Sequence, residues 1–308
     1  MTQDNNSRDI QEIISWIEKK SPEPWEVLYR VVTDNSNLVH IKVNPLLHIK
    51  WGVLEAGKAF WNDIWQKSGY KVPVEEQGGE LLTRLPNPII ISASEAAGIS
   101  ETSFIGRAFG GMPSDKMDAV LFSLVKRQLQ YVNGKLPKKY FSINLEAPVT
   151  NNIAWQDICQ LFLDKGNEKV SIELIERKKF PLFSQYDLAN VCRDAETKIS
   201  LDDLGSGIHD LGTPEGEVYL REIITVLGEY LTTFKMDYDI VRNMSNNLDA
   251  VGQVGYNLTA VAWLWMYCAG GRKMPSVTFE SMPRQDRHWL LAIQKICSLF
   301  NGVLWQVE

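Results

Sequence analysis

The sequence predicts a TIM-like (β/α)8 barrel of the α/β class, and three observations lead to this prediction. Short strand-like runs alternate with helical patterns over roughly the last two thirds of the chain. These runs are apolar over most of their length, as in parallel sheets whose two faces are covered by helices. Acidic and amide residues stand at the C-terminal ends of successive runs, where the functional side chains of such barrels converge.

The strand and helix candidates follow one another in series. Strands are expected at Trp25–Val32, 139–145, 170–174, 198–203, 232–237, 276–280 and 302–307, with a further one at 88–92. Helices are expected at 8–20, 115–132, 151–164, 184–195, 217–230, 247–269 and 284–300. An open doubly wound sheet is the alternative, but its usual GxGxxG after the first strand is absent.

The domain organisation expected is one barrel with additions. Residues 1–24 form a helical N-terminal extension, and residues 25–308 form the barrel. The stretch at about 34–98 is interpreted as an insertion or small subdomain, with a helix candidate at Trp51–Trp65. Its tryptophans Trp51, Trp61 and Trp65 offer a surface for a protein partner, although core packing is the commoner role of any one tryptophan.

Composition excludes several classes of function. The chain has 308 residues and a net charge of −6, which argues against a DNA-binding surface. The cysteines Cys159, Cys192, Cys268 and Cys297 are far apart and form no CxxC pair, so neither a disulfide framework nor a zinc site is expected. The N-terminus is polar, and the longest apolar stretch is too short to span a bilayer. A cytoplasmic protein is expected.

The candidate site consists of oxygen-bearing residues at strand ends. In a barrel these ends converge, so Glu26, Asn144, Glu173, Asp202, Asp203 and Glu280 are expected to meet in one pocket near Lys235. Carboxylates gathered in this way repel one another, and Mg²⁺ or Mn²⁺ would relieve the repulsion. Two such ions about 3.5–4 Å apart can clamp a phosphodiester. The alternative for a single strand-end acid is a helix cap.

Several of these residues lie in motifs that resemble one family. Leu201–Gly207 (LDDLGSG) resembles the DDFGTG motif of EAL-domain phosphodiesterases, and Trp25–Arg30 (WEVLYR) looks like the motif that names the family. Further resemblances follow in the family's order, over Ser100–Leu129, Ser142–Leu145, Glu173–Glu176, Phe234–Asp237, Thr278–Glu280 and Asn301–Gly302. The matches cover roughly residues 25–33 and 100–304.

The resemblance implies hydrolysis of cyclic di-GMP to linear pGpG by a homodimer that uses two ions, Mg²⁺ or Mn²⁺. It implies that Glu26, Asn144, Glu173 and Asp202 hold one ion, and that Asp202, Asp203 and Glu280 hold the other. Lys235, Glu280 and Asp203 would be catalytic, with Lys235 orienting the attacking water. Arg30 and Asn301 would contact the substrate, and Glu176 would steady the loop after Asp203.

The chain also departs from the family pattern. The QP strand expected before Trp25 is replaced by a stretch with a helical pattern, so the first strand is expected to be irregular. AEGVE becomes Phe279–Pro283 (FESMP), and QG becomes Asn301–Gly302. The sequence is therefore compatible with two functions. One is a metal-dependent phosphodiesterase, and the other is an inactive relative that acts as a cyclic di-GMP receptor or a protein-binding adaptor.

Overall fold

The computed structural model describes residues 2–49, 74–133, 140–148, 153–164, 170–244, 247–280, 293 and 295–306. The helix candidate Trp51–Trp65, its tryptophans and most of the helix candidate 284–300 lie outside these residues. The chain divides into two compact units. The first comprises Met1–Lys42, Leu81–Leu136 and Pro148–Asp164, and the second comprises Val43–Glu80, Pro137–Ala147 and Lys165–Glu308.

The first unit is mainly helical. Within it α1 packs on α5, α2 on α6, and α7 on α8. Their bounds are α1 (Thr2–Lys20), α2 (Pro24–Tyr29), η1 (Arg30–Asp34), η2 (Ser36–Leu38), α5 (Asn87–Ala97), α6 (Glu101–Gly111), α7 (Ser114–Asn133) and α8 (Ile153–Leu163).

The strand predicted at Trp25–Val32 is wrong, because this segment forms α2 and η1. Pro24 stands at the first turn of α2, where a missing N–H costs nothing. The buried residues are Val27, Leu28, Val31 and Val32, and this spacing marks one face of a helix rather than the alternation of a strand. The strand predicted at 88–92 is wrong for a similar reason. It lies in α5, which also has a proline in its first turn.

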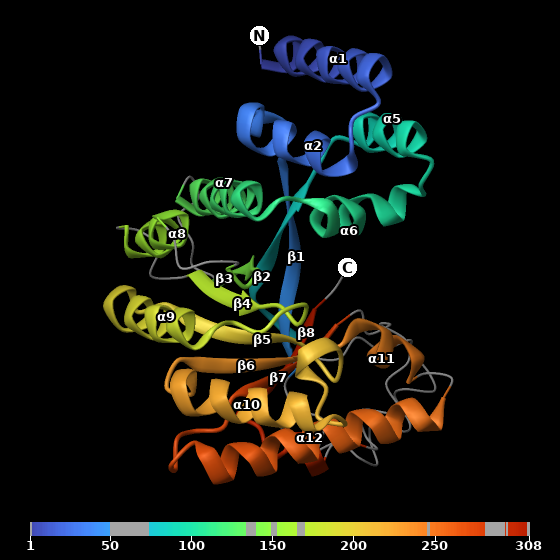
Figure 1. The fold of residues 1–308 in the computed structure, drawn as a ribbon. Coiled ribbons are helices and arrows are strands. Elements are labelled where there is room, and N and C mark those ends of the chain that lie inside the picture. The colour runs from blue at the N-terminus through green and yellow to red at the C-terminus, as the bar shows by residue number, and fades with distance from the viewer. Residues whose placement is uncertain are drawn as a thin grey trace. The chain divides into compact units, whose positions relative to one another are not determined.

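Eight strands form a closed barrel in the order β1 to β8 (Figure 1). Strands β3 to β8 pair in parallel, whereas β1 pairs antiparallel with β8. The bounds are β1 (His40–Ile49), β2 (Val74–Arg84), β3 (Tyr140–Leu145), β4 (Val170–Leu174), β5 (Lys198–Leu204), β6 (Leu231–Met236), β7 (Ser276–Glu280) and β8 (Val303–Gln306). The TIM-like barrel is thus confirmed, and six of its strands lie where the sequence predicts them.

The stretch 34–98 supplies the two remaining strands, β1 and β2, together with α5. Strand β1 closes the sheet by pairing with β8, from Leu46 opposite Gln306 to Ile49 opposite Val303. The residues interpreted as an insertion therefore include part of the barrel itself, and the irregular first strand is the antiparallel β1.

Helices of the second unit follow the parallel strands in sequence. They are α9 (Leu182–Ala195), η3 (Gly207–His209), α10 (Pro214–Leu227), α11 (Tyr238–Asn243) and α12 (Leu248–Cys268). Figure 1 shows α10 beside both α9 and α12. The core between helices and sheet is aromatic, with Phe234 edge-on to both Trp265 and Phe300. Among the described helices, none is long and apolar enough to cross a membrane.

Candidate active site

Four carboxylates from four strands surround the ammonium group of Lys235, which is 2% exposed. Lys235 Nζ lies 2.6 Å from Asp202 Oδ1, 2.8 Å from Glu280 Oε1 and 2.9 Å from Glu173 Oε2. The fourth carboxylate belongs to Glu80, whose Oε2 is 3.9 Å from the same nitrogen. Among the residues that the structure describes, one positive charge thus faces these four acids in a buried setting.

A bulge in β5 brings two neighbouring aspartates to this place. The register passes from Leu201 opposite Phe234 to Leu204 opposite Met236, so Asp202 and Asp203 together face the single residue Lys235. In a regular strand adjacent side chains point to opposite faces of the sheet. Here the bulge and the positive φ of 47° at Asp203 re-aim one of them. Carboxylate oxygens of Asp202, Asp203 and Glu176 consequently lie within 4.8 Å of one another.

Glu80 is a site residue that the sequence does not predict. It lies on β2, is buried, and accepts hydrogen bonds from Asn144 Nδ2 at 2.6 Å and from Gln306 Nε2. The sequence contains a pattern that could have identified Glu80, because ExLxR occurs twice, at Glu26–Arg30 and at Glu80–Arg84. The second copy lies on a barrel strand and the first on a helix.

Two amide oxygens beside Glu80 add to the oxygen donors of the site. Asn144 Oδ1 and Gln306 Oε1 are buried and have no hydrogen-bond partner among the described residues. A buried polar atom without a partner is costly, and such atoms commonly mark a ligand or ion site. Carboxylate and amide oxygens are the donors that hard divalent cations prefer. The residues present therefore fit a divalent cation.

The electrostatics of the cluster indicate an excess of negative charge. Burial raises the pKa of Glu173 to about 8, despite the attraction of Lys235. Burial, together with repulsion from Asp202 and Glu280, raises the pKa of Asp203 to about 9. Burial also raises the pKa of Glu280 to about 7. Burial alone would lower the pKa of Lys235, but the surrounding carboxylates hold it well above its usual value. One ammonium does not compensate so many buried acids.

Glu176 lies in the turn after β4 and contacts the loop that follows Asp203. Its carbonyl accepts a hydrogen bond from Ile208 N at 3.1 Å. Gly207, with φ of +51°, approaches it so closely that an added Cβ would lie 2.6 Å from Glu176 O. The loop-steadying role expected for Glu176 remains a prediction, and these contacts are the geometry on which it would depend.

Three predicted site residues make other contacts. Glu26 and Arg30 belong to the first unit. The Glu26 carboxylate accepts a hydrogen bond from Glu23 N at the start of its own helix, and the Arg30 guanidinium lies 4.5 Å from the ring centre of Trp16. Asn301 is exposed and precedes β8, and its N–H donates to Pro275 O at the opposite end of the strands. The amide that does reach the cluster is Gln306, at the C-terminal end of β8.

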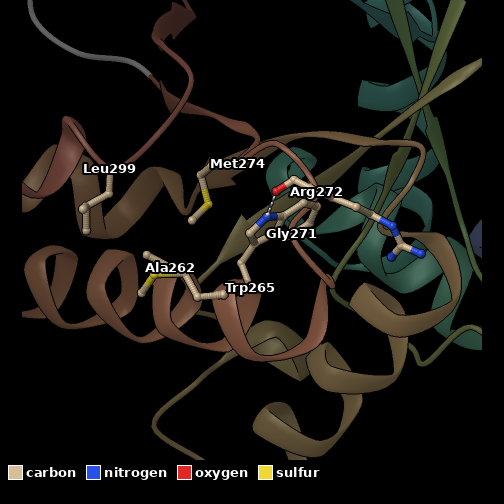
Figure 2. A pocket seen from close by; sticks show the side chains of 7 residues that line it. Ala262, Trp265, Gly271, Arg272, Met274 and Leu299 are labelled. Atoms are coloured by element: carbon tan, nitrogen blue, oxygen red, sulfur yellow. Dashed lines mark hydrogen bonds between the residues drawn. The ribbon is translucent and has the colours of Figure 1, made fainter.

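A separate hollow of about 300 Å³ lies beside the turn between α12 and β7 (Figure 2). Trp265, Met266, Met274 and Leu299 line it, and Trp265 Nε1 donates to Arg272 O at 3.2 Å. Its lining residues Met274 and Leu299 come shortly before β7 and β8 in the chain, so the hollow lies near the N-terminal ends of these strands. The acids stand at the C-terminal ends. It therefore belongs to a different face of the barrel from the candidate site.

The closed barrel with an antiparallel β1 and acids at its strand ends is an EAL-like fold. Similar solved structures include an EAL-domain protein from Listeria monocytogenes, with 16% identity, a TM-score of 0.54, and 91% of this chain and 89% of that chain covered. The PaMucR phosphodiesterase in complex with c-di-GMP has 14% identity, a TM-score of 0.51 and coverage of 91% and 94%.

A third similar structure is the Bacillus subtilis YkuI protein with c-di-GMP and calcium. It has 13% identity and a TM-score of 0.51, and the match covers 93% of this chain and 56% of that one. Sequence comparison finds no matching family model and no matching curated protein. The resemblance proposed from the motifs is thus confirmed as a shared fold at low identity, which is consistent with a divergent member.

Proposed function

We propose that this chain is a phosphodiesterase that depends on divalent cations and hydrolyses cyclic di-GMP to linear pGpG. The observation that carries the proposal is the set of carboxylates around Lys235, with unpaired amide oxygens beside them. Glu80, Asn144, Glu173 and Asp202 would hold one Mg²⁺ or Mn²⁺, and Asp202, Asp203 and Glu280 would hold a second. The fold shared with phosphodiesterases of the EAL type supports the same assignment.

In the proposed reaction a water oxygen bonds to phosphorus, and the bond from phosphorus to one 3′ oxygen breaks. Bound divalent cations would supply an activated water and would neutralise phosphate charge. Lys235 Nζ lies between Asp202 and Glu280, and it would orient that water once a bound cation takes over a carboxylate and frees one of its three N–H groups.

The test compares two glutamates in one assay. Purified protein is incubated with Mn²⁺ and cyclic di-GMP, and pGpG is measured by chromatography. Glu80→Gln is expected to lower the rate by about 100-fold, since loss of a metal ligand costs at least as much as loss of its supporting residues. Glu26→Gln, in the first copy of the ExLxR pattern, is the matched control and should retain the rate. Loss of activity in Glu26→Gln alone would contradict the assignment.

The second candidate function is a receptor that binds cyclic di-GMP without hydrolysing it, and the position of Lys235 favours this function. An ammonium that already lies 2.6–2.9 Å from three carboxylates provides an internal counter-charge for the site. A cation must compete with this contact. Calorimetric binding of cyclic di-GMP without any pGpG, at saturating Mn²⁺, would identify the receptor.

A homodimer also remains a proposal, and the outer side of α12 supports it. Trp263, Met266 and Tyr267 are 62%, 63% and 70% exposed, and the rings of Trp263 and Tyr267 stack at 6.1 Å. Exposed apolar side chains gathered on one helix mark contact surfaces. Sedimentation of the unsubstituted protein should show a dimer that Trp263→Glu dissociates. A monomer at all concentrations would rule out this interface.

A further inference from the structure

We propose that His209 is a positioning residue that holds the Asp202–Asp203 bulge in the conformation that binds cations. The consequence for cation binding depends on the function proposed above. The role of His209 in holding the bulge does not depend on that function, because it follows from contacts within the second unit.

The first contact joins the histidine ring to the backbone of the bulge. His209 is fully buried, and its Nδ1 lies 2.5 Å from the carbonyl oxygen of Asp202. A carbonyl oxygen only accepts hydrogen bonds, so Nδ1 carries the proton and the ring is held in one tautomer. The bond reaches the residue whose carboxylate lies closest to Lys235.

Further contacts fix the histidine itself. Its ring stacks on Tyr219 of α10, with centroids 5.9 Å apart and planes within 3°. The hydroxyl of Tyr219 accepts a hydrogen bond from Phe180 N at 3.0 Å. The carbonyl of His209 accepts from Gly205 N at 3.1 Å. Two hydrogen bonds of His209 thereby join the end of this loop to Asp202 and to Gly205.

The bulge needs such support because its backbone is strained. Asp203 adopts a positive φ, which few residues other than glycine tolerate and which costs of order 1–3 kcal/mol. Such a conformation persists only where the surroundings impose it. The regular strand register, which would otherwise hold the backbone, is interrupted between Leu201 and Leu204. His209 supplies a side-chain donor at this interruption.

The alternative is that His209 only fills space in the core. Two substitutions distinguish this packing role from the positioning role. His209→Phe keeps a ring against Tyr219 and removes the donor. His209→Asn removes the ring and keeps an N–H donor near the place of Nδ1. The proposal expects His209→Phe to lower Mn²⁺ affinity by about 10–100-fold, as loss of residues that support metal ligands does. It expects His209→Asn to stay close to the unsubstituted protein.

The measurement is calorimetric titration of Mn²⁺, accompanied by circular dichroism to confirm folding. Equal losses in the two variants, or an unchanged affinity in His209→Phe, would overturn the positioning role.

A second readout needs no cation. In EDTA, hydrogen exchange of the Gly205 and Ser206 amides should be faster in His209→Phe than in His209→Asn. Nitrogen-15 NMR of the unsubstituted protein should show a proton on Nδ1 of His209. A proton on Nε2 instead, or equal exchange in the two variants, overturns the proposal. If the unsubstituted protein binds no Mn²⁺, the proposed function fails while these measurements still decide the role of His209.

Discussion

Lys235 is the residue on which the cluster depends when no divalent cation is bound. Its ammonium is the positive group shared by Asp202, Glu173 and Glu280, each within 2.9 Å. A buried charge that loses its partner is strongly destabilising, whereas removal of the whole set is not. The lysine therefore has a structural role as well as its proposed role beside the water.

Lys235→Met should separate these two roles. Without cations and at pH 8, we expect the variant to lose about 3–5 kcal/mol of unfolding free energy, the typical cost of an uncompensated buried charge. Adding Mg²⁺ should restore most of the stability, because the ion replaces the ammonium as counter-charge, but hydrolysis should stay absent. Urea unfolding with and without Mg²⁺ measures this. A variant as stable as the parent in EDTA would contradict it.

Single residues also show how far sequence reasoning reaches. Glu173, Asp202, Asp203 and Glu280 follow apolar strands, and the structure brings them together as that placement predicts. Glu26 is predicted because its apolar neighbours resemble a strand, whereas Glu80 follows a polar stretch with two glycines and is not predicted. Pro24 in the first turn and the helical spacing of the buried residues indicate a helix instead, and that spacing becomes clear only when burial is known.

At the scale of elements, the loop after β5 is set by close backbone contact. Gly207 has φ of +51°, and a Cβ there would lie 2.6 Å from Glu176 O. Both the conformation and the space exclude a side chain, so the glycine allows the loop to approach the turn after β4.

Gly207→Ala should therefore destabilise the protein by about 1–3 kcal/mol, the usual cost of a strained backbone at such a position. Gly252→Ala is the matched control, because it lies within α12 with nothing within 4 Å of an added Cβ. It should stabilise by about 0.5–1 kcal/mol through helix propensity. Urea unfolding of both variants gives the comparison, and equal effects would show that the close contact is not limiting.

Strands β1 and β2 escaped prediction for reasons of local composition. Strand β1 contains Pro45, a residue that usually argues against a strand interior. After Val74, strand β2 continues with two acids, a glutamine and two glycines, which are weak strand formers. Both strands are held by their neighbours in the closed sheet, including the pairing of β1 with β8, and such distant contacts leave no local signal.

For the whole molecule, alternation of strands and helices was enough to predict the barrel, because each β/α unit is local. Closure was not predictable in detail, since it joins β1 near residue 45 to β8 near residue 305 in antiparallel register. The site combines residues from both kinds of region. Its parallel-strand acids were predicted, and its contributions from β2 and the end of β8 were not.

The charge state of the site should make stability depend on pH. Glu173, Asp203 and Glu280 have folded pKa values of about 8, 9 and 7, all above those of the unfolded chain. Between about pH 5 and 9 the folded protein therefore holds protons that the unfolded chain has released, and rising pH destabilises it. Burial lowers the pKa of His209 to about 4, so below about pH 6.5 the unfolded chain gains a proton and falling pH destabilises the fold.

Three raised carboxyl pKa values outweigh one lowered histidine pKa, so stability in EDTA should fall as the pH rises from about 6 to 9. The melting temperature should fall by about 5 °C or more between pH 6 and pH 9, since three raised carboxyl pKa values act in the same direction. Mg²⁺ should reduce this fall, because a bound cation stabilises the ionised carboxylates and replaces the protons. The shift caused by Mg²⁺ is therefore larger at pH 9 than at pH 6, and calorimetry at the two values measures it. A melting temperature that rises with pH in EDTA would show that the acids are already compensated and would leave the cluster no need for a cation.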